Sequence, residues 1–171
     1  GDPVELRPRA LRCLVVTLSD RAADGAYEDL SGPRLAGLLE EFLRTSKFRP
    51  RIERSLLPDD PEALRSELAA HLAAGCDLIF TTGGTGIGPR DRTPEVVSGL
   101  CDRLIPGVME YIRVRAGREN PHALLSRSVA GAAGTCLLFA LPGSPRAVEE
   151  YLEEIFRHLE HMIRTVRGLG H

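Results

Sequence analysis

The sequence predicts a single α/β domain with three layers (αβα), in which helices cover both faces of a mostly parallel central sheet. Two observations support this fold class. Short apolar runs typical of buried parallel strands alternate with segments whose apolar residues recur at helical spacing. The chain has 171 residues, a length that suits one domain with a substantial core. Its 43% hydrophobic and 27% charged residues are ordinary for a globular protein.

The chain is expected to begin with an arm and then a strand. Residues 1–10 carry two prolines and no hydrophobic period, so they are expected to form a flexible arm ahead of a domain spanning 11–167. Residues 11–18 are mostly apolar and suit a buried parallel strand. Ser31 is placed to cap the first long helix. One face of that helix would carry Leu35, Leu38, Leu39, Phe42 and Leu43.

Two further strands and a helix are expected before the middle of the chain. Residues 49–57 are consistent with a second strand. Asp60 and Pro61 have the residue types of an N-cap and a first helical position. Residues 77–82 form a third apolar run. Thr93 is placed to cap the helix that follows.

The last third of the chain contains a clear strand and a long helix. Pro106 begins a helix expected to reach about residue 117, whereas residues 120–134 show no period that assigns them. Residues 135–141 predict a strand, and Ser144 precedes Pro145 at the start of a long amphipathic helix. The apolar side of that helix comprises Val148, Tyr151, Leu152, Ile155, Leu159, Met162 and Val166.

A cluster of glycines lies in the segment 80–94, directly after the third strand. Glycine lets main-chain N–H groups approach a ligand without obstruction by a Cβ atom, and concave runs of N–H groups attract phosphate. Pro89 excludes a Walker A loop, which needs Lys there, and a dinucleotide fingerprint, which needs Gly. A phosphate-binding loop and a tight turn without a ligand both remain possible. The glycines are Gly83, Gly84, Gly86 and Gly88.

The segments that follow the strands should converge, because ligands of open α/β sheets bind beyond the carboxyl ends of the strands. These segments are 19–20, 58–59, 83–91 and 142–144. Two of them supply an isolated carboxylate, Asp59 and Asp91. Asp59 could instead share a capping role with Asp60, and Asp91 could be a solvated loop charge.

Two carboxylates facing a loop of N–H groups would suit Mg²⁺, which binds one or two carboxylates together with substrate phosphates. Such a site would neutralise charge on a departing pyrophosphate and align the attacking group. The residues therefore predict nucleotidyl transfer, phosphoryl transfer or nucleotide hydrolysis, with Asp59 and Asp91 as catalytic residues and metal ligands.

Other classes of function are disfavoured by composition. A net charge of −2 and the absence of Trp argue against nucleic acid and against an anionic membrane. No apolar run approaches the length of a membrane span. The four cysteines show no metal-ligand spacing, which indicates reduced thiols in a cytoplasmic protein. His158 and His161 lack a third ligand nearby, so solvated or packed histidines are favoured over a metal site.

Taken in order, the motifs resemble the molybdenum-cofactor biosynthesis family that includes bacterial MogA and MoaB and the G domain of gephyrin. The matching pieces extend over nearly the whole chain. They are TLSDR at 17–21, DLSGP at 29–33, LPD at 57–59, TTGGTG at 81–86 with RD at 90–91, LSRS at 125–128 and LPGSP at 141–145.

The resemblance implies a molybdopterin adenylyltransferase, which transfers AMP from MgATP to the molybdopterin phosphate and releases pyrophosphate. It assigns catalysis and metal binding to Asp59 and Asp91. It also implies a homotrimer and transfer of the product to a molybdenum-insertion enzyme. Substrate binding is assigned to Ser19, Asp20, Gly83, Gly84, Thr85, Gly86, Ser126, Arg127, Ser128, Pro142, Gly143 and Ser144.

Two alternatives stay open at this point. The first is a non-catalytic pterin-binding scaffold or carrier with the same fold. The second is a nucleotide-pyrophosphate hydrolase or amidase, as on the related domain of competence-damage-type proteins, which would turn over without a pterin.

Overall fold

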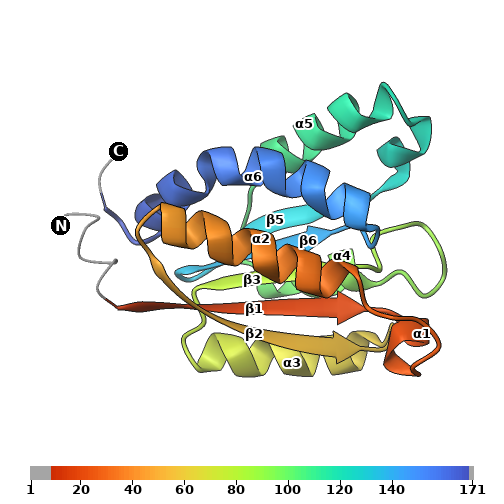
Figure 1. The fold of residues 1–171 in the computed structure, drawn as a ribbon, viewed down its shortest axis with the longest axis horizontal. Helices are drawn as coiled ribbons and strands as arrows, with labels where there is room; N and C mark the ends of the chain where they lie inside the picture. The colour runs from red at the N-terminus through yellow and green to blue at the C-terminus, as the bar shows by residue number, and fades with distance from the viewer. Residues whose placement is uncertain (1–8, 170–171) are drawn as a thin grey trace.

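A computed structural model describes residues 9–169, which form a three-layer αβα structure around a twisted sheet (Figure 1). Within these residues the sheet has six strands in the order β2-β1-β3-β6-β5-β4. The predicted fold class is therefore confirmed. The strands are β1 (Ala10–Leu18), β2 (Arg49–Leu57), β3 (Leu78–Thr82), β4 (Arg103–Leu104), β5 (Val129–Ala133) and β6 (Cys136–Leu141).

The sheet is parallel on one side and antiparallel on the other. Strands β2, β1, β3 and β6 run parallel, with Cys13 paired to Leu78 and Leu78 paired to Leu137. Strands β5 and β4 continue the sheet in antiparallel pairing. This edge was not anticipated, because the β5 sequence Val-Ala-Gly-Ala-Ala offers neither large apolar side chains nor an alternating pattern.

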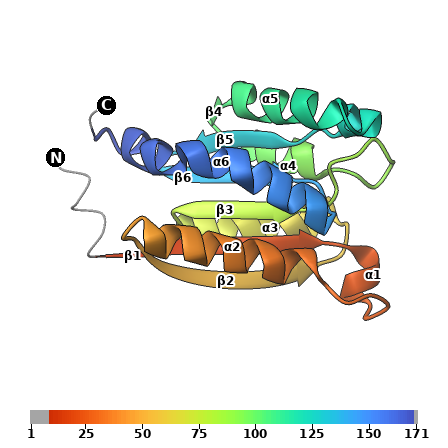
Figure 2. The ribbon, with the colours of Figure 1, turned by 45° about the horizontal axis from the view of Figure 1, so that its top comes forward.

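Helices lie on both faces of the sheet, as Figure 2 shows. One face is covered by α2 (Ser31–Thr45), α5 (Pro106–Gly117) and α6 (Pro145–Val166). The other is covered by α3 (Pro61–Ala73) and α4 (Thr93–Leu100). Two short helices, α1 (Asp20–Ala23) and η2 (Pro121–Leu125), follow the end of β1 and of α5. Within the described residues, no helix is both long and apolar enough to cross a bilayer.

Two hydrophobic cores result from the alternation of side chains along the strands. In β1, Cys13 and Val15 pack under α2 and α6, whereas Leu14 and Val16 pack against α3 and α4. The first core contains the stacked rings of Phe80 and Phe139, whose centroids are 4.7 Å apart. The apolar runs in the sequence are continuous because both faces of these strands are buried.

The helix starts differ in part from expectation. Asp60 caps α3 as predicted, since its side chain accepts from the N–H of Glu62 at 3.0 Å. The prediction that Ser31 caps α2 is wrong. Asp29 accepts from the N–H of Gly32 at 2.9 Å, and the Ser31 hydroxyl donates to the Gly143 carbonyl at 2.6 Å. Ser31 thus ties α2 to the loop before α6.

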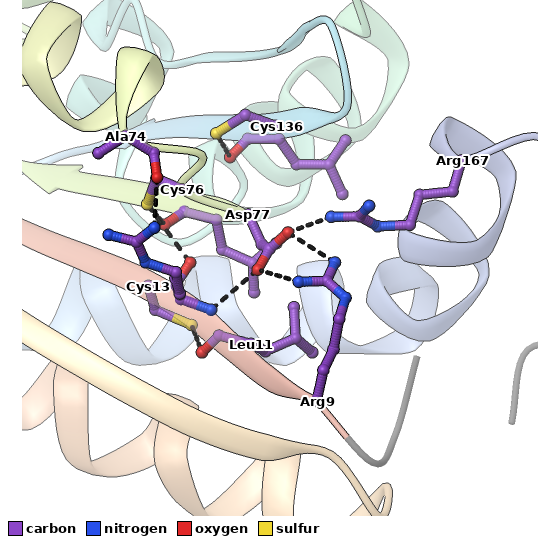
Figure 3. A network of polar contacts seen from close by, with 11 residues as sticks. Arg9, Leu11, Cys13, Ala74, Cys76, Asp77, Cys136 and Arg167 are labelled. Atoms are coloured by element: carbon purple, nitrogen blue, oxygen red, sulfur yellow. Dashed lines mark hydrogen bonds and ion pairs between the residues drawn. The ribbon is translucent and has the colours of Figure 1, made fainter. Parts of the chain in front are cut away.

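A buried carboxylate lies at the amino end of the parallel strands, beside the start of β3 (Figure 3). Asp77 is 4% exposed and accepts from the Arg12 N–H at 2.9 Å, from Arg9 at 3.0 Å and from Arg167. The strand β1 begins at Ala10, so Arg9 and Ala10 of the expected arm belong to the ordered fold. The rest of that arm, residues 1–8, lies outside the described residues.

Candidate functional site

An open cleft of about 590 Å³ lies at the carboxyl ends of β1, β3 and β6. Most of the residues expected to form the site line this one cleft, although they come from segments far apart in the sequence. The expected residues that line it are Ser19, Asp59, Gly83, Gly84, Thr85, Gly86, Asp91, Ser126, Pro142 and Gly143. Asp20, Arg127, Ser128 and Ser144 do not line it.

The glycine loop is packed so closely that side chains would not fit. Gly83 and Gly84 have φ values of +106° and +72°, in the left-handed region that favours glycine. A Cβ at Gly83 would lie 2.3 Å from the Leu18 carbonyl oxygen, and one at Gly84 would lie 2.3 Å from Thr93 Oγ1. Gly143 approaches from the other side, because a Cβ there would lie 3.3 Å from the Gly83 Cα.

The main-chain N–H groups of this loop fall into two groups. The N–H of Gly83 donates to the Leu141 carbonyl at 3.0 Å, which joins the loop to the end of β6. Among residues 9–169, no hydrogen bond uses the N–H groups of Gly84, Thr85 or Gly86. Unpaired main-chain N–H groups of a turn are the donors that an anion needs. The candidate anion site therefore centres on 84–86.

Hydrogen bonds with two other segments, through Asp20 and Arg90, hold the main chain of Asp59 in place. Its N–H donates to Asp20 Oδ1 at 2.8 Å, and Asp59 Oδ2 lies 3.4 Å from the N–H of Asp20. Arg90 donates to both Asp20 carboxylate oxygens, at 2.8 and 3.0 Å, and to the Asp59 carbonyl at 3.0 Å. Asp20 therefore supports Asp59 and is ion-paired with Arg90, which explains why it does not line the cleft.

Asp91 is surrounded by the loop that contains it. Its Oδ2 accepts from the Gly88 N–H at 2.9 Å. Cβ atoms at Gly86 and Gly88 would lie 2.8 and 2.9 Å from the same oxygen. These two glycines thus leave room for the carboxylate, which turns back over the loop.

The Asp59 carboxyl is affected by burial and by the charges around it. Burial raises the pKa of the Asp59 carboxyl, and the negative charges of Asp20 and Asp91 raise it further, while the Asp20 N–H and Arg90 oppose this. The hydrogen bond from Arg90 lowers the pKa of Asp20. Asp59 therefore carries a repulsion from Asp91 that a cation between them would relieve.

Mg²⁺ fits these residues only if a substrate supplies further ligands. Within residues 9–169 no group of three or more His, Cys, Asp or Glu side chains could hold a metal ion. Asp59 and Asp91 provide two carboxylates beside unpaired N–H groups. That donor set suits Mg²⁺, which typically binds one or two carboxylates and completes its shell with phosphate oxygens and water.

The structure gives three of the expected substrate-binding side chains other contacts. Arg127 bonds to loop carbonyls and to Glu95. Ser128 is 5% exposed. Its hydroxyl accepts a hydrogen bond from Arg113 at 2.6 Å and donates one to the Tyr151 hydroxyl at 3.1 Å. The expectation that Ser128 lines the pocket is wrong. Ser144 caps α6 through the Ala147 N–H at 3.1 Å.

A second cavity of about 240 Å³ adjoins the cleft and shares His122, Ser126 and Pro142 with it. Ser144 lines this cavity, together with Tyr151. The Ser126 hydroxyl, 3.3 Å from Thr85 Oγ1, lies where the two hollows meet. The candidate site is therefore a cleft with a side chamber.

Four side chains that line the cleft were not among the predicted site residues: Leu18, Ile87, His122 and Leu125. His122 belongs to the stretch 120–134, which carries no period, so nothing local indicated its position. Ile87 is 72% exposed at the edge of the glycine loop. An apolar residue in a polar, glycine-rich loop was a usable signal for this position.

Fold and cleft together define an α/β protein with an anion-accepting loop and two acidic side chains at the carboxyl edge of a mostly parallel sheet. The sequence matches the family described as "Probable molybdopterin binding domain" over residues 14–161. The chain belongs to this family.

Relatives and solved structures agree with this assignment. The "Molybdopterin adenylyltransferase" of Helicobacter pylori is 36% identical over 158 residues, 90% of this chain and 86% of that protein. MoaB from Thermus thermophilus, described as a molybdopterin biosynthesis enzyme, superposes with a TM-score of 0.80 at 38% identity over 92% and 97% of the two chains. MoaB from Pyrococcus furiosus, described as a tungsten cofactor synthesizing protein, has a TM-score of 0.78 at 32% identity over 94% and 99%.

Proposed function

We propose that this protein is a molybdopterin adenylyltransferase, which transfers AMP from ATP to the molybdopterin phosphate and releases pyrophosphate. The observation that carries the proposal is the meeting of Asp59, Asp91 and the unpaired N–H groups of 84–86 in one cleft. The relatives that bear this name, at 36% identity over most of the chain, support it.

The proposed roles follow from the chemistry of each group. The N–H groups of Gly84, Thr85 and Gly86 donate to phosphate oxygens of ATP. Asp59 and Asp91 would hold Mg²⁺, which also takes phosphate oxygens as ligands. When bound, Mg²⁺ neutralises the charge that develops on the departing pyrophosphate. Gly83 and Gly143 keep the floor of the cleft bare, so that the triphosphate can approach the main chain.

The reaction needs no covalent nucleophile from the protein. The terminal phosphate of molybdopterin attacks the α-phosphorus of ATP, so the protein aligns two anionic substrates and offsets their repulsion. We place the pterin in the side chamber lined by Tyr151 and Ser144, because it opens onto the cleft at Ser126. Pro142 lines both hollows, whereas Ser19 and Gly143 line the cleft, where ATP is placed.

The decisive experiment measures pyrophosphate release from MgATP with and without molybdopterin. The proposal expects release that depends on both molybdopterin and Mg²⁺. Binding of molybdopterin without any pyrophosphate release would favour a scaffold or carrier. Release without molybdopterin would favour a nucleotide hydrolase.

We also propose a homotrimer in the cytoplasm that passes its product to a molybdenum-insertion enzyme, as the family resemblance implies. Exposed apolar side chains on β4 and α5 support an assembly surface: Leu104 is 55% exposed, Tyr111 52% and Val114 54%. Light scattering after size-exclusion chromatography should give three times the chain mass. Tyr111→Glu should shift the protein towards the monomer, whereas an unchanged mass would place the interface elsewhere.

A further inference from the structure

Arg127 lies between η2 and β5 and reaches across to both ends of the glycine loop. Its main-chain N–H donates to the Thr85 carbonyl at 2.7 Å. Its Nε donates to the Gly86 carbonyl at 2.8 Å, and its Nη2 donates to the Asp91 carbonyl at 2.7 Å. One side chain therefore joins the beginning and the end of the segment 86–91.

The same guanidinium is paired with a carboxylate of the protein itself. Its Nη1 donates to both carboxylate oxygens of Glu95 in α4, at 2.7 and 3.0 Å. A guanidinium has five N–H groups on three nitrogens, and these contacts engage all three nitrogens. Arg127 therefore has little capacity left for a substrate phosphate, and its charge is already paired.

The position of Asp91 depends on this arrangement. Its carbonyl is held by Arg127 and its carboxylate is held by the Gly88 N–H of the same segment. The free N–H groups of 84–86 adjoin the carbonyls that Arg127 binds. Movement of Arg127 would shift the carboxylate and the anion-binding main chain together.

We propose that Arg127 is a positioning residue, with Glu95 as its partner, that sets the Asp91 carboxylate and the 84–86 main chain in the geometry needed to bind a divalent cation with a nucleotide triphosphate. The inference rests on the proposed function of the cleft. It replaces the direct substrate contact that the family resemblance implies for Arg127.

The test is Arg127→Lys, which keeps the positive charge but cannot span two carbonyls and a carboxylate at once. Arg44→Lys is the matched control, because Arg44 pairs with Glu40 on the exposed side of α2, and neither residue lines the cleft. Loss of a group that orients a metal ligand typically lowers metal affinity or activity about 10- to 100-fold. We expect Arg127→Lys to raise the Mg²⁺ concentration at half-maximal rate by about 10-fold or more and to lower kcat, with the KM for molybdopterin changed less than about threefold.

A second measurement does not depend on turnover. Mn²⁺ binding is followed by electron paramagnetic resonance in the presence of an ATP analogue with a methylene bridge between the α- and β-phosphates. Arg127→Lys should weaken Mn²⁺ binding by about 10-fold or more, and Arg44→Lys should not. Glu95→Gln should weaken it in the same direction, and it serves as the test variant if Arg127→Lys does not fold.

The outcomes separate the inference from the proposed function. A raised KM for molybdopterin or ATP with unchanged metal dependence would mean that Arg127 contacts substrate, which overturns the inference. A lowered melting temperature with unchanged kcat and metal dependence would also overturn it. If the wild type releases no pyrophosphate, the proposed function fails, and the Mn²⁺ measurement still decides whether Arg127 positions a cation site.

Discussion

Asp59 and Asp91 lie in the same cleft but are held in different ways. Asp59 is supported by residues from two other segments, Asp20 and Arg90. The Asp91 carboxylate is held by its own loop through Gly88, and its carbonyl is held by Arg127. A change at either carboxylate should therefore affect chemistry more than folding, because neither side chain is part of the hydrophobic cores.

Replacement of either carboxylate by its amide is the first prediction. Asp59→Asn and Asp91→Asn should each lower kcat for molybdopterin-dependent pyrophosphate release by a factor of about 10²–10³, because each removes an electrostatic contact at the reacting phosphates. Pyrophosphate is measured by a coupled assay, and molybdopterin binding by fluorescence. Wild-type rates in both variants would show that neither carboxylate takes part in catalysis.

Glycines 37 and 84 should respond in opposite ways to the same added methyl group. A Cβ at Gly84 would lie 2.3 Å from Thr93 Oγ1 with a φ of +72°, so Gly84→Ala should lower the free energy of unfolding by about 1–3 kcal/mol. Gly37 lies within α2 and a Cβ there meets nothing within 4 Å. Gly37→Ala should raise the free energy of unfolding by about 0.5–1 kcal/mol.

Urea denaturation of the two alanine variants measures this difference. Pyrophosphate release should fall in Gly84→Ala and stay at the wild-type level in Gly37→Ala. Equal stability of the two variants would contradict the close packing of the glycine loop.

At the scale of elements, α3 is joined to the edge strand β2 by a histidine. The two ring nitrogens of His71 face the Glu67 carbonyl at 3.0 Å and the Glu53 carboxylate at 3.1 Å. The protonated ring can donate to both acceptors at once. Burial acts to lower the pKa of His71, but these two hydrogen bonds outweigh it, so the pKa is raised above its usual 6.5.

The sign of the resulting pH dependence follows from linkage. Because the pKa of His71 is raised in the folded state, its contribution to the free energy of unfolding is fully present below pH 6.5. This contribution is lost as the pH rises through the folded-state pKa. The free energy of unfolding of the wild type should therefore fall as the pH rises from 6.5 through the folded-state pKa of His71. His71→Gln should show a smaller fall over the same range in urea titrations, and an identical slope would refute the role of this pair.

At the scale of the molecule, Asp77 joins the start of β1 to the end of α6. Arg9 and Arg167 both donate to this buried carboxylate (Figure 3). Asp77→Ala would leave the partly buried Arg167 without its partner, and breaking a buried ion pair typically costs about 3–5 kcal/mol. We expect a loss of that order in the free energy of unfolding, measured by urea denaturation at fixed protein concentration.

An exposed ion pair provides the control for this prediction. Arg34 and Glu149 are 2.7 Å apart with side chains about half exposed. Glu149→Ala should cost less than about 1 kcal/mol, because surface pairs are screened by water. A loss in Asp77→Ala as small as that in Glu149→Ala would show that the network contributes little.

The alternation of strands and helices was readable from the sequence because it depends on local patterns. Residues 49–57 form β2 within the expected limits, and Asp60 caps α3 as its residue type indicates. The convergence of Asp59, the glycine loop and Asp91 was also predictable. The ends of parallel strands must meet at one edge, wherever their residues lie in the sequence.

Contacts between distant segments could not be read in this way. Nothing near Arg127 in the sequence indicates that its side chain is used up by Gly86, Asp91 and Glu95, or that Ser128 is enclosed by Arg113 and Tyr151. Residue types and spacing decide which groups can donate or accept. Which of these groups meet depends on how the helices pack against the sheet. That packing determines whether a side chain faces the cleft or the interior, because the direction of a side chain is set by the element that carries it.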